Sequence, residues 1–361
     1  MNALGGLRND CKACSQAVPI LQDAVGLWEA LVEKAGGQPW ELLLATGDHA
    51  KASAELNNLS VTMGNLANAL RSSGQHDEAL KVAEKAVFIQ KKLGNQPNVA
   101  TGHGQCAQIL MAGGRHNEAD SRYEVALAAA RQAGDKGLEG SLLQHQGSLA
   151  DDRRQFARAA ALYQQALQRF QDAGDQPSMM RTYNLLGVVE QTAGRLAEAR
   201  AWYEKSRQLA VALKDQPGLG AAAQNIGIVC QLEGESAREL GDESAARSSF
   251  QSALRFVEDS LQVWQAQRNE PDEAASHGQL AQNHLLLGDL TAAEQHAHAA
   301  REIRESLGLK DVWIDYYTLS EIAKARGDTA AAAEWAQKRD AKRAELQRLA
   351  RGGGGPPSQM Q

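Results

Sequence analysis

The stretch YNLLGVVEQTAGRLAEARAWYEKS, residues 183–206, has the pattern of two helices joined by a tight turn at Gly194. Before the turn, the small residue Gly187 follows the apolar Leu186, and after it Ala199 begins a second apolar stripe with helical spacing. A small residue lets two helices approach closely, and its apolar neighbour fills the contact. The stretch therefore predicts a helical hairpin with one apolar stripe on each helix.

The same pattern recurs along most of the chain. An alanine follows each turn, at Ala79, Ala119, Ala159, Ala199, Ala246, Ala293 and Ala332, in steps of 40, 40, 40, 47, 47 and 39 residues. A small residue precedes each turn, at Ala67, Ala107, Gly147, Gly187, Gly227, Ala281 and Ser320. Self-similarity at a fixed period indicates a repeat architecture. The chain is therefore expected to be all-α, with about seven recognisable repeats.

This pattern resembles the tetratricopeptide repeat, in which a Trp/Leu–Gly/Ala–Tyr helix precedes an Ala–Phe/Tyr–Ala helix. The best match is residues 183–206, and the resemblance covers roughly residues 51–350. The 40-residue period is longer than the usual 34 and looks like the repeats of kinesin light chain, of the LGN adaptor and of MalT-type and Rap-type regulators. The resemblance implies a right-handed superhelical solenoid that binds peptides or protein segments in its concave groove.

Three segments are expected along the chain. Residues 1–50 lack a full repeat and are expected to form an N-terminal helical cap or a partial repeat, with one helix ending at Gly36. Residues 51–351 are expected to form the solenoid. Residues 352–361, GGGGPPSQMQ, have the composition of a disordered tail or linker.

One repeat is longer than the others. Residues 230–246, CQLEGESARELGDESAA, contain two turn signals, at Gly234 and Gly241. Because Ala246 lies seven residues further along than the repeat requires, the turn is expected at Gly241. The next spacing is also seven residues longer, so both helices grow by about 10 Å and can still pair. An elongated hairpin at about 220–270 is predicted. Its extension is expected to be structural, and the alternative is that it forms a lateral docking ridge. The residues expected to face its partner helix are Val257, Leu261 and Trp264.

Composition excludes several classes of function. The net charge is −6 and the sequence pI is about 5.9, with no basic surplus of the kind typical of nucleic-acid binders. No apolar run reaches the roughly 18 residues of a membrane span, and the N-terminus lacks a secretory signal pattern. A cytoplasmic protein without membrane insertion is expected. Frequent alanine, and arginine in excess of lysine, suggest a bacterial source.

The sequence contains no credible catalytic or metal-binding set. The pair Cys11 and Cys14 lacks the second pair of ligands that a structural zinc site needs. His296 and His298 are two residues apart and do not share a helix face. Four further residues occupy packing positions of the repeat, namely His103, Cys106, His277 and His284. Phosphate-loop and nucleophile-elbow motifs are missing. We therefore expect no enzyme activity, no metal and no cofactor.

The predicted binding residues follow from the resemblance. In those families the fifth, sixth and ninth positions of the first helix of each repeat point into the groove. With Met63 as the fourth position, these places hold mainly amides, which can both donate and accept hydrogen bonds. The expected peptide-binding residues are Asn65, Asn68, Gln105, Gln108, Gln144, Asn184, Gln224, Asn225, Gln279 and Gln282. Arg181, at a second position, is expected to contact an acidic group. The alternative is an exposed polar face with no ligand.

The resemblance implies two candidate functions. The first is a protein–protein interaction scaffold that binds a peptide or protein segment in the concave groove. The alternative is a ligand- or peptide-sensing regulatory array of a larger signalling system.

Overall fold

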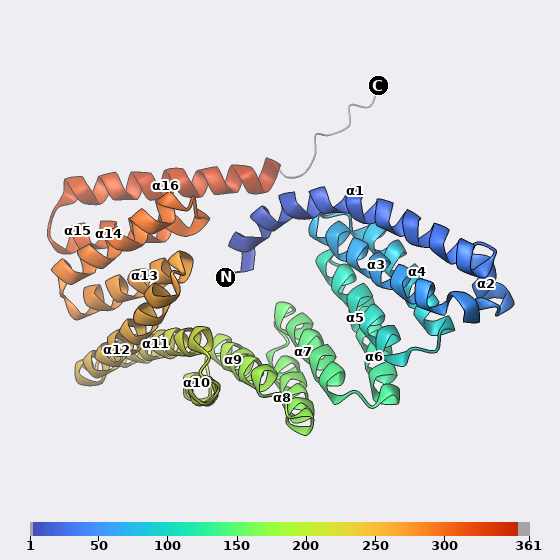
Figure 1. The fold of residues 1–361 in the computed structure, drawn as a ribbon. Helices are drawn as coiled ribbons and strands as arrows, with labels where there is room; N and C mark the ends of the chain where they lie inside the picture. The colour runs from blue at the N-terminus through green and yellow to red at the C-terminus, as the bar shows by residue number, and fades with distance from the viewer. Residues whose placement is uncertain (1–2, 353–361) are drawn as a thin grey trace. The chain divides into compact units, whose positions relative to one another are not determined.

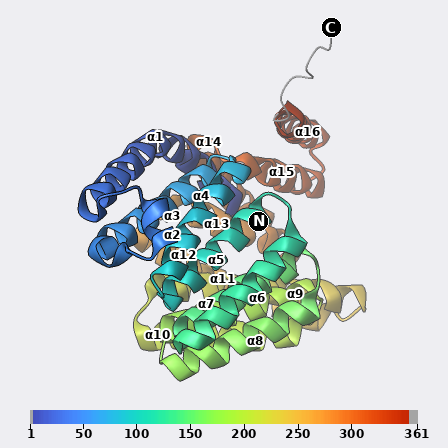
Figure 2. The ribbon, with the colours of Figure 1, turned by 90° about the vertical axis from the view of Figure 1, so that its right-hand side faces the viewer.

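The structure, a computed structural model, describes residues 3–352, with side chains from residue 16 to residue 349. Within that range the regular elements are sixteen α-helices and two short 3₁₀ helices, and β-strands are absent. The chain divides into two compact units, Met1–Val189 and Glu190–Gln361. Each unit is a series of antiparallel helices that follow one another along the chain (Figures 1 and 2). The predicted all-α solenoid of helical hairpins is therefore correct.

The first unit contains the N-terminal helices and three complete hairpins. Its helices are α1 (Ala3–Gly36), α2 (Trp40–Thr46), α3 (Ser53–Ser72), α4 (His76–Lys92), α5 (Gln96–Ala112), α6 (His116–Ala133), α7 (Lys136–Asp152) and α8 (Phe156–Ala173), with a 3₁₀ turn at His49–Ala52. Helix α9 (Gln176–Thr192) begins in this unit and ends in the next. The long α1 packs along α3, and the hairpins are α3–α4, α5–α6 and α7–α8.

The second unit contains the elongated hairpin and the last two hairpins. Its helices are α10 (Leu196–Leu213), α11 (Gln216–Glu239), α12 (Glu243–Gln267), α13 (Glu270–Leu287), α14 (Leu290–Ser306), α15 (Trp313–Ala325) and α16 (Thr329–Gly352), with a 3₁₀ turn at Lys310–Val312. The packed pairs are α11–α12, α13–α14 and α15–α16. The segment expected to be a disordered tail lies outside the described residues, apart from Gly352 at the end of α16.

The turns within the hairpins are closed by a residue in the left-handed region. At Gly194 the φ angle is +79°, and the following amide, of Arg195, donates to the carbonyl of Glu190 at 2.9 Å. This bond caps the last turn of the first helix, as in a Schellman motif. Arg154 takes the same place in the hairpin that lacks a glycine there, with φ of +56°. Its left-handed conformation carries strain that glycine avoids.

Several turns between hairpins are closed by side-chain caps. The carboxylate of Asp135 accepts a hydrogen bond from the amide of Leu138 at 2.9 Å, and Asp215 accepts one from Gly218 at 3.0 Å. Such caps satisfy amides that have no partner inside the helix. The recurrent phrases between repeats, such as GDQPS and KDQPG, therefore act as helix starts.

Glycines set the separation of the paired helices. A Cβ at Gly147 would lie 2.6 Å from the Tyr163 ring, and one at Gly140 would lie 2.7 Å from the Phe170 ring. The two rings are buried, at 1% exposure each. These aromatic rings therefore occupy the space above glycines of the partner helix.

The elongated hairpin has its turn at Gly241, where φ is +82°. Helix α11 has 24 residues and α12 has 25, against 17 in α5 and 18 in α6. Three glycines of α11 face buried side chains of α12: Gly220 faces Trp264, Gly227 faces Val257 and Gly234 faces Phe250. Gly234 therefore makes a third close contact within the added length. Leu261, expected to face the partner helix, is only half-buried.

Candidate binding groove

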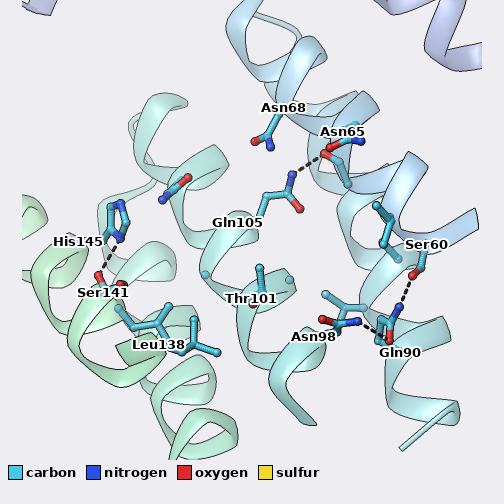
Figure 3. Close-up of a pocket in the computed structure, with 18 residues that line it drawn as sticks. Ser60, Asn65, Asn68, Gln90, Asn98, Thr101, Gln105, Leu138, Ser141 and His145 are labelled. Atoms are coloured by element: carbon cyan, nitrogen blue, oxygen red, sulfur yellow. Dashed lines mark hydrogen bonds between the residues drawn. The ribbon is translucent and has the colours of Figure 1, made fainter. Parts of the chain in front are cut away.

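A pocket of about 340 Å³ lies on the first unit, where α3, α5 and α7 follow one another (Figure 3). Its apolar part comes from α4 and α7, through Ala86, Val87, Leu138 and Leu142. Its polar rim comes mainly from side chains of α3 and α5. The pocket is therefore shared by three consecutive repeats, which fix its walls through their helix packing.

One end of the pocket is closed by a network of amides and a hydroxyl. Gln90, on α4, donates to Ser60 and to Asn57, the latter at 3.0 Å. Asn98, on α5, donates to the Gln90 side-chain oxygen at 3.2 Å, as Figure 3 shows. These groups satisfy one another, so this end is a rigid polar wall. Sequence reasoning missed it because only first helices were considered, whereas Gln90 belongs to a second helix.

Four of the predicted residues line this pocket, namely Asn65, Asn68, Gln105 and Gln108. Gln105 reaches from α5 to α3, where its amide donates to the carbonyl of Gly64 at 2.5 Å (Figure 3). Asn65 and Asn68 are exposed and Gln108 is half-buried. These four residues hold the sixth and ninth positions of two successive repeats.

Gly64, the fifth position of the first of these repeats, lines the pocket, whereas the fifth positions of the next two repeats face the following helix. A Cβ at Gly104 would lie 2.6 Å from Leu142 of α7, and Gln144 donates to Thr182 of α9 at 3.4 Å. Asn184, also at a fifth position, has a buried side-chain oxygen with no hydrogen-bond partner among the described residues. Arg181 is exposed and donates to Ser178 of its own helix at 2.7 Å.

The remaining predicted residues belong to the second unit, on α11 and α13. Gln224, at a fifth position, is buried, with 9% of its surface exposed. Neighbouring helices therefore cover most of Gln224, and its role in binding stays a prediction. Asn225, Gln279 and Gln282 are half-buried, and the Gln279 side-chain oxygen is buried without a partner among the described residues.

The pocket of the first unit carries no formal charge. Its eighteen lining residues include no Asp, Glu, Lys or Arg, although 23% of the chain is charged. His145 is its one titratable side chain, and it contacts the Ser141 carbonyl at 2.8 Å. His145 is exposed at the edge of the pocket, and partial desolvation lowers its pKa below the ordinary value of 6.5, so the ring is mainly neutral at neutral pH. The site can supply hydrogen bonds and apolar contact, but no ion pair.

A cluster of three histidines between α13 and α14 was not anticipated as a group. The Nδ1 atoms of His277 and His296 are 2.9 Å apart, and the rings of His284 and His296 stack at 5.6 Å. Burial, followed by the neighbouring imidazoles, lowers the pKa of His296 to about 4. Glu273 lies 3.9 Å from His277, and Asp289 lies 3.6 Å from His284.

The histidine cluster predicts a loss of stability in acid. The folded chain holds His296 neutral, whereas an unfolded histidine takes up a proton near pH 6.5. The stability that the protein owes to neutral His296 is therefore fully present above about pH 6.5 and is lost as the pH falls towards about 4. His296→Gln should reduce the fall in melting temperature between pH 7 and pH 4.5, measured by circular dichroism. His298→Gln is the control, because His298 packs against Trp335 instead. An equal fall in wild type and His296→Gln would contradict the prediction.

The other candidate ligand residues pack as parts of the helices. Cys106 is buried, and burial raises the pKa of its thiol to about 11. His103 lies 3.5 Å from a guanidinium nitrogen of Arg122. Among the residues with described side chains, no group of three or more His, Cys, Asp or Glu is arranged to hold a metal ion. Cys11 and Cys14 lie outside that range.

A family model described as the tetratricopeptide repeat matches residues 58–132 and 178–241. These segments include most of α3 to α6 and most of α9 to α11. No curated protein sequence matches the chain. In the part of the chain that the structure describes, no helix is long and apolar enough to cross a membrane.

Solved structures with TM-scores of 0.50 and above share the fold. A signal-transduction ATPase with a tetratricopeptide-repeat sensor, from Pyrococcus horikoshii, superposes with a TM-score of 0.67 at 12% identity, covering 94% of this chain and 53% of that one. The chain thus spans about half the length of that ATPase. The type IV pilus biogenesis factor PilW gives a TM-score of 0.50 at 21% identity, covering 70% and 98%. A putative kinesin light chain from Podosopora anserina gives 0.46 at 19% identity, covering 59% and 98%.

Proposed function

Because tetratricopeptide repeats match residues 58–132 and 178–241, we propose that the chain is a protein-interaction scaffold. Its partner is an extended protein or peptide segment that lies along α3, α5 and α7 of the first unit. The observation that carries this proposal is the pocket with amides of successive repeats on its rim. The net charge of −6 favours a protein partner over a nucleic acid.

Three amides of the rim are available to such a segment. Asn65, Asn68 and Gln108 line the pocket and are exposed or half-buried. A peptide backbone alternates donors and acceptors, and a carboxamide supplies both. Each hydrogen bond contributes about 0.5–1.5 kcal/mol net. Three of them contribute about 1.5–4.5 kcal/mol, so apolar contact in the pocket and elsewhere along the segment must supply the rest of the roughly 8 kcal/mol that micromolar binding requires.

Replacing these three amides should weaken partner binding. We expect Asn65→Ala, Asn68→Ala and Gln108→Ala together to raise the Kd at least about tenfold, because two or three bonds are lost at roughly 0.5–1.5 kcal/mol each. The partner is captured from the source organism, identified by mass spectrometry, produced in pure form and titrated by calorimetry. The melting temperature should change little, since these side chains lie on the surface or half-buried.

The matched control replaces three exposed amides on second helices, outside the pocket. Gln132 lies on α6, and Gln164 and Gln171 lie on α8. Changing all three to alanine should leave the Kd unchanged. If the pocket variant bound its partner as tightly as wild type, the site would lie elsewhere on the chain.

A sensing role is the second candidate. The Pyrococcus horikoshii structure that shares this fold carries its repeats as a sensor in a signal-transduction ATPase. If this chain acts similarly, its captured partner should be an effector whose activity changes on binding. An ATPase measurement on that partner, with and without the chain, separates the two roles.

A further inference from the structure

We propose that the pocket on α3, α5 and α7 selects an uncharged, apolar residue at the anchoring position of the bound segment and rejects both acidic and basic residues. The inference rests on the proposed function, which says only that a segment binds there. It adds the chemistry of the residue that enters the pocket.

The lining gives a charged residue no partner. The eighteen lining residues include no Asp, Glu, Lys or Arg, and His145, at the exposed edge, is mainly neutral at neutral pH. A charge that leaves water without an ion pair is strongly disfavoured. The amides that could soften this cost are partly engaged already, because Gln90 and Asn98 bond within the polar wall and Gln105 bonds to Gly64.

The depth of the pocket depends on Gly64. Gly102 and Gly104 are needed for helix packing, since a Cβ on either would lie within 2.6 Å of Val87 or Leu142. At Gly64 a Cβ would meet only the Gln105 side chain, with the oxygen at 3.3 Å. A side chain at position 64 would therefore extend into the pocket without disturbing the core. The volume of about 340 Å³ accommodates an aliphatic side chain together with adjoining backbone.

Rejection of both acidic and basic residues distinguishes local desolvation in the pocket from long-range electrostatics. The chain has a net charge of −6, so a field effect alone would disfavour acidic segments and favour basic ones. Long-range effects also weaken in salt, because the Debye length falls to about 3 Å at 1 M. Local desolvation in an uncharged pocket disfavours both signs and persists in salt.

The test uses a library of random twelve-residue peptides displayed on phage and selected on the full chain. Selected peptides are synthesised, and their affinities for wild type, Gly64→Leu and Gly64→Ala are measured by fluorescence polarisation. We expect an apolar residue whose replacement by Asp or by Lys weakens binding at least tenfold, in 0.1 M and in 0.5 M salt. Gly64→Leu should weaken binding at least tenfold, and Gly64→Ala less. Both variants should keep the melting temperature of wild type or exceed it, because leucine and alanine favour helix over glycine.

The possible outcomes distinguish failure of the selectivity inference from failure of the proposed function. If Lys is accepted at the anchoring position while Gly64→Leu abolishes binding, the selectivity inference is wrong and the groove proposal stands. If selected peptides bind Gly64→Leu as tightly as wild type, both are wrong, because the peptides bind elsewhere. If no peptide is selected and native mass spectrometry finds a small molecule that Gly64→Leu excludes, the occupant is a metabolite and both proposals fail.

Discussion

Deleting Glu233–Glu239 from α11 should lower the free energy of unfolding by about 3–5 kcal/mol, as much as truncating a buried aromatic side chain to alanine. The deletion shortens the first helix of the elongated hairpin by about 10 Å. It removes Gly234, which faces the fully buried Phe250. Phe250 and the start of α12 are then left without a partner helix. Urea unfolding followed by circular dichroism measures the change.

The matched control is a double deletion, which removes Ala246–Ser252 from α12 as well as Glu233–Glu239 from α11. This second deletion takes out Phe250 but keeps Asp242, whose side chain caps α12 by accepting from Ala245 at 2.9 Å. The two inner contacts, Gly227 with Val257 and Gly220 with Trp264, are preserved. The double deletion should therefore cost clearly less than the single one. A single deletion as stable as wild type would show that the added length contributes no packing.

The architecture of this hairpin was largely predictable, because the lengths of its helices follow from residue spacings in the sequence. The small residues and alanines recur at a fixed period, so an extra seven residues in each helix identify Gly241 as the turn. The role of Gly234 could not be predicted in the same way. In sequence terms a glycine inside a helix only costs about 1 kcal/mol. Its contact with Phe250 depends on how the two helices pair in space.

The candidate site was predictable only in part. The resemblance to tetratricopeptide repeats placed Asn65, Asn68, Gln105 and Gln108 on the groove-facing side of successive helices, and they do line one pocket. Periodicity does not show how close the next helix lies, and so Gln224 was expected in the open but is buried. Nor does it reveal contributions from second helices.

Spatial pairing also explains the histidine cluster. His277 and His284 are seven residues apart on α13, which places them on one helix face. The third member, His296, comes from α14, and only the packing of the two helices brings its ring against theirs. The sequence contains no motif for such a contact, because the two helices meet through their tertiary arrangement.

Replacing Gly147 with leucine should destabilise the first unit by about 3 kcal/mol, the upper part of the usual cost of overpacking a core. The new Cβ would lie 2.6 Å from the Tyr163 ring, which is 1% exposed. The ring cannot move aside freely, because its hydroxyl lies 3.1 Å from the Ser148 hydroxyl. Gly147→Ala should cost less, since the preceding repeat has Ala107 at the same position, with the buried Tyr123 at the same offset.

The control for backbone effects is Gly26→Ala on α1, where a Cβ would meet nothing within 4 Å. Alanine favours helix over glycine by about 1 kcal/mol, so this variant should be slightly more stable than wild type. Adding Tyr163→Ala to Gly147→Leu should recover part of the loss, because the two positions compete for one space and their effects are not additive. Thermal and urea unfolding of the four variants measure these differences. If Gly147→Leu were as stable as Gly26→Ala, the close approach of α7 and α8 at Gly147 would not be what holds this hairpin together.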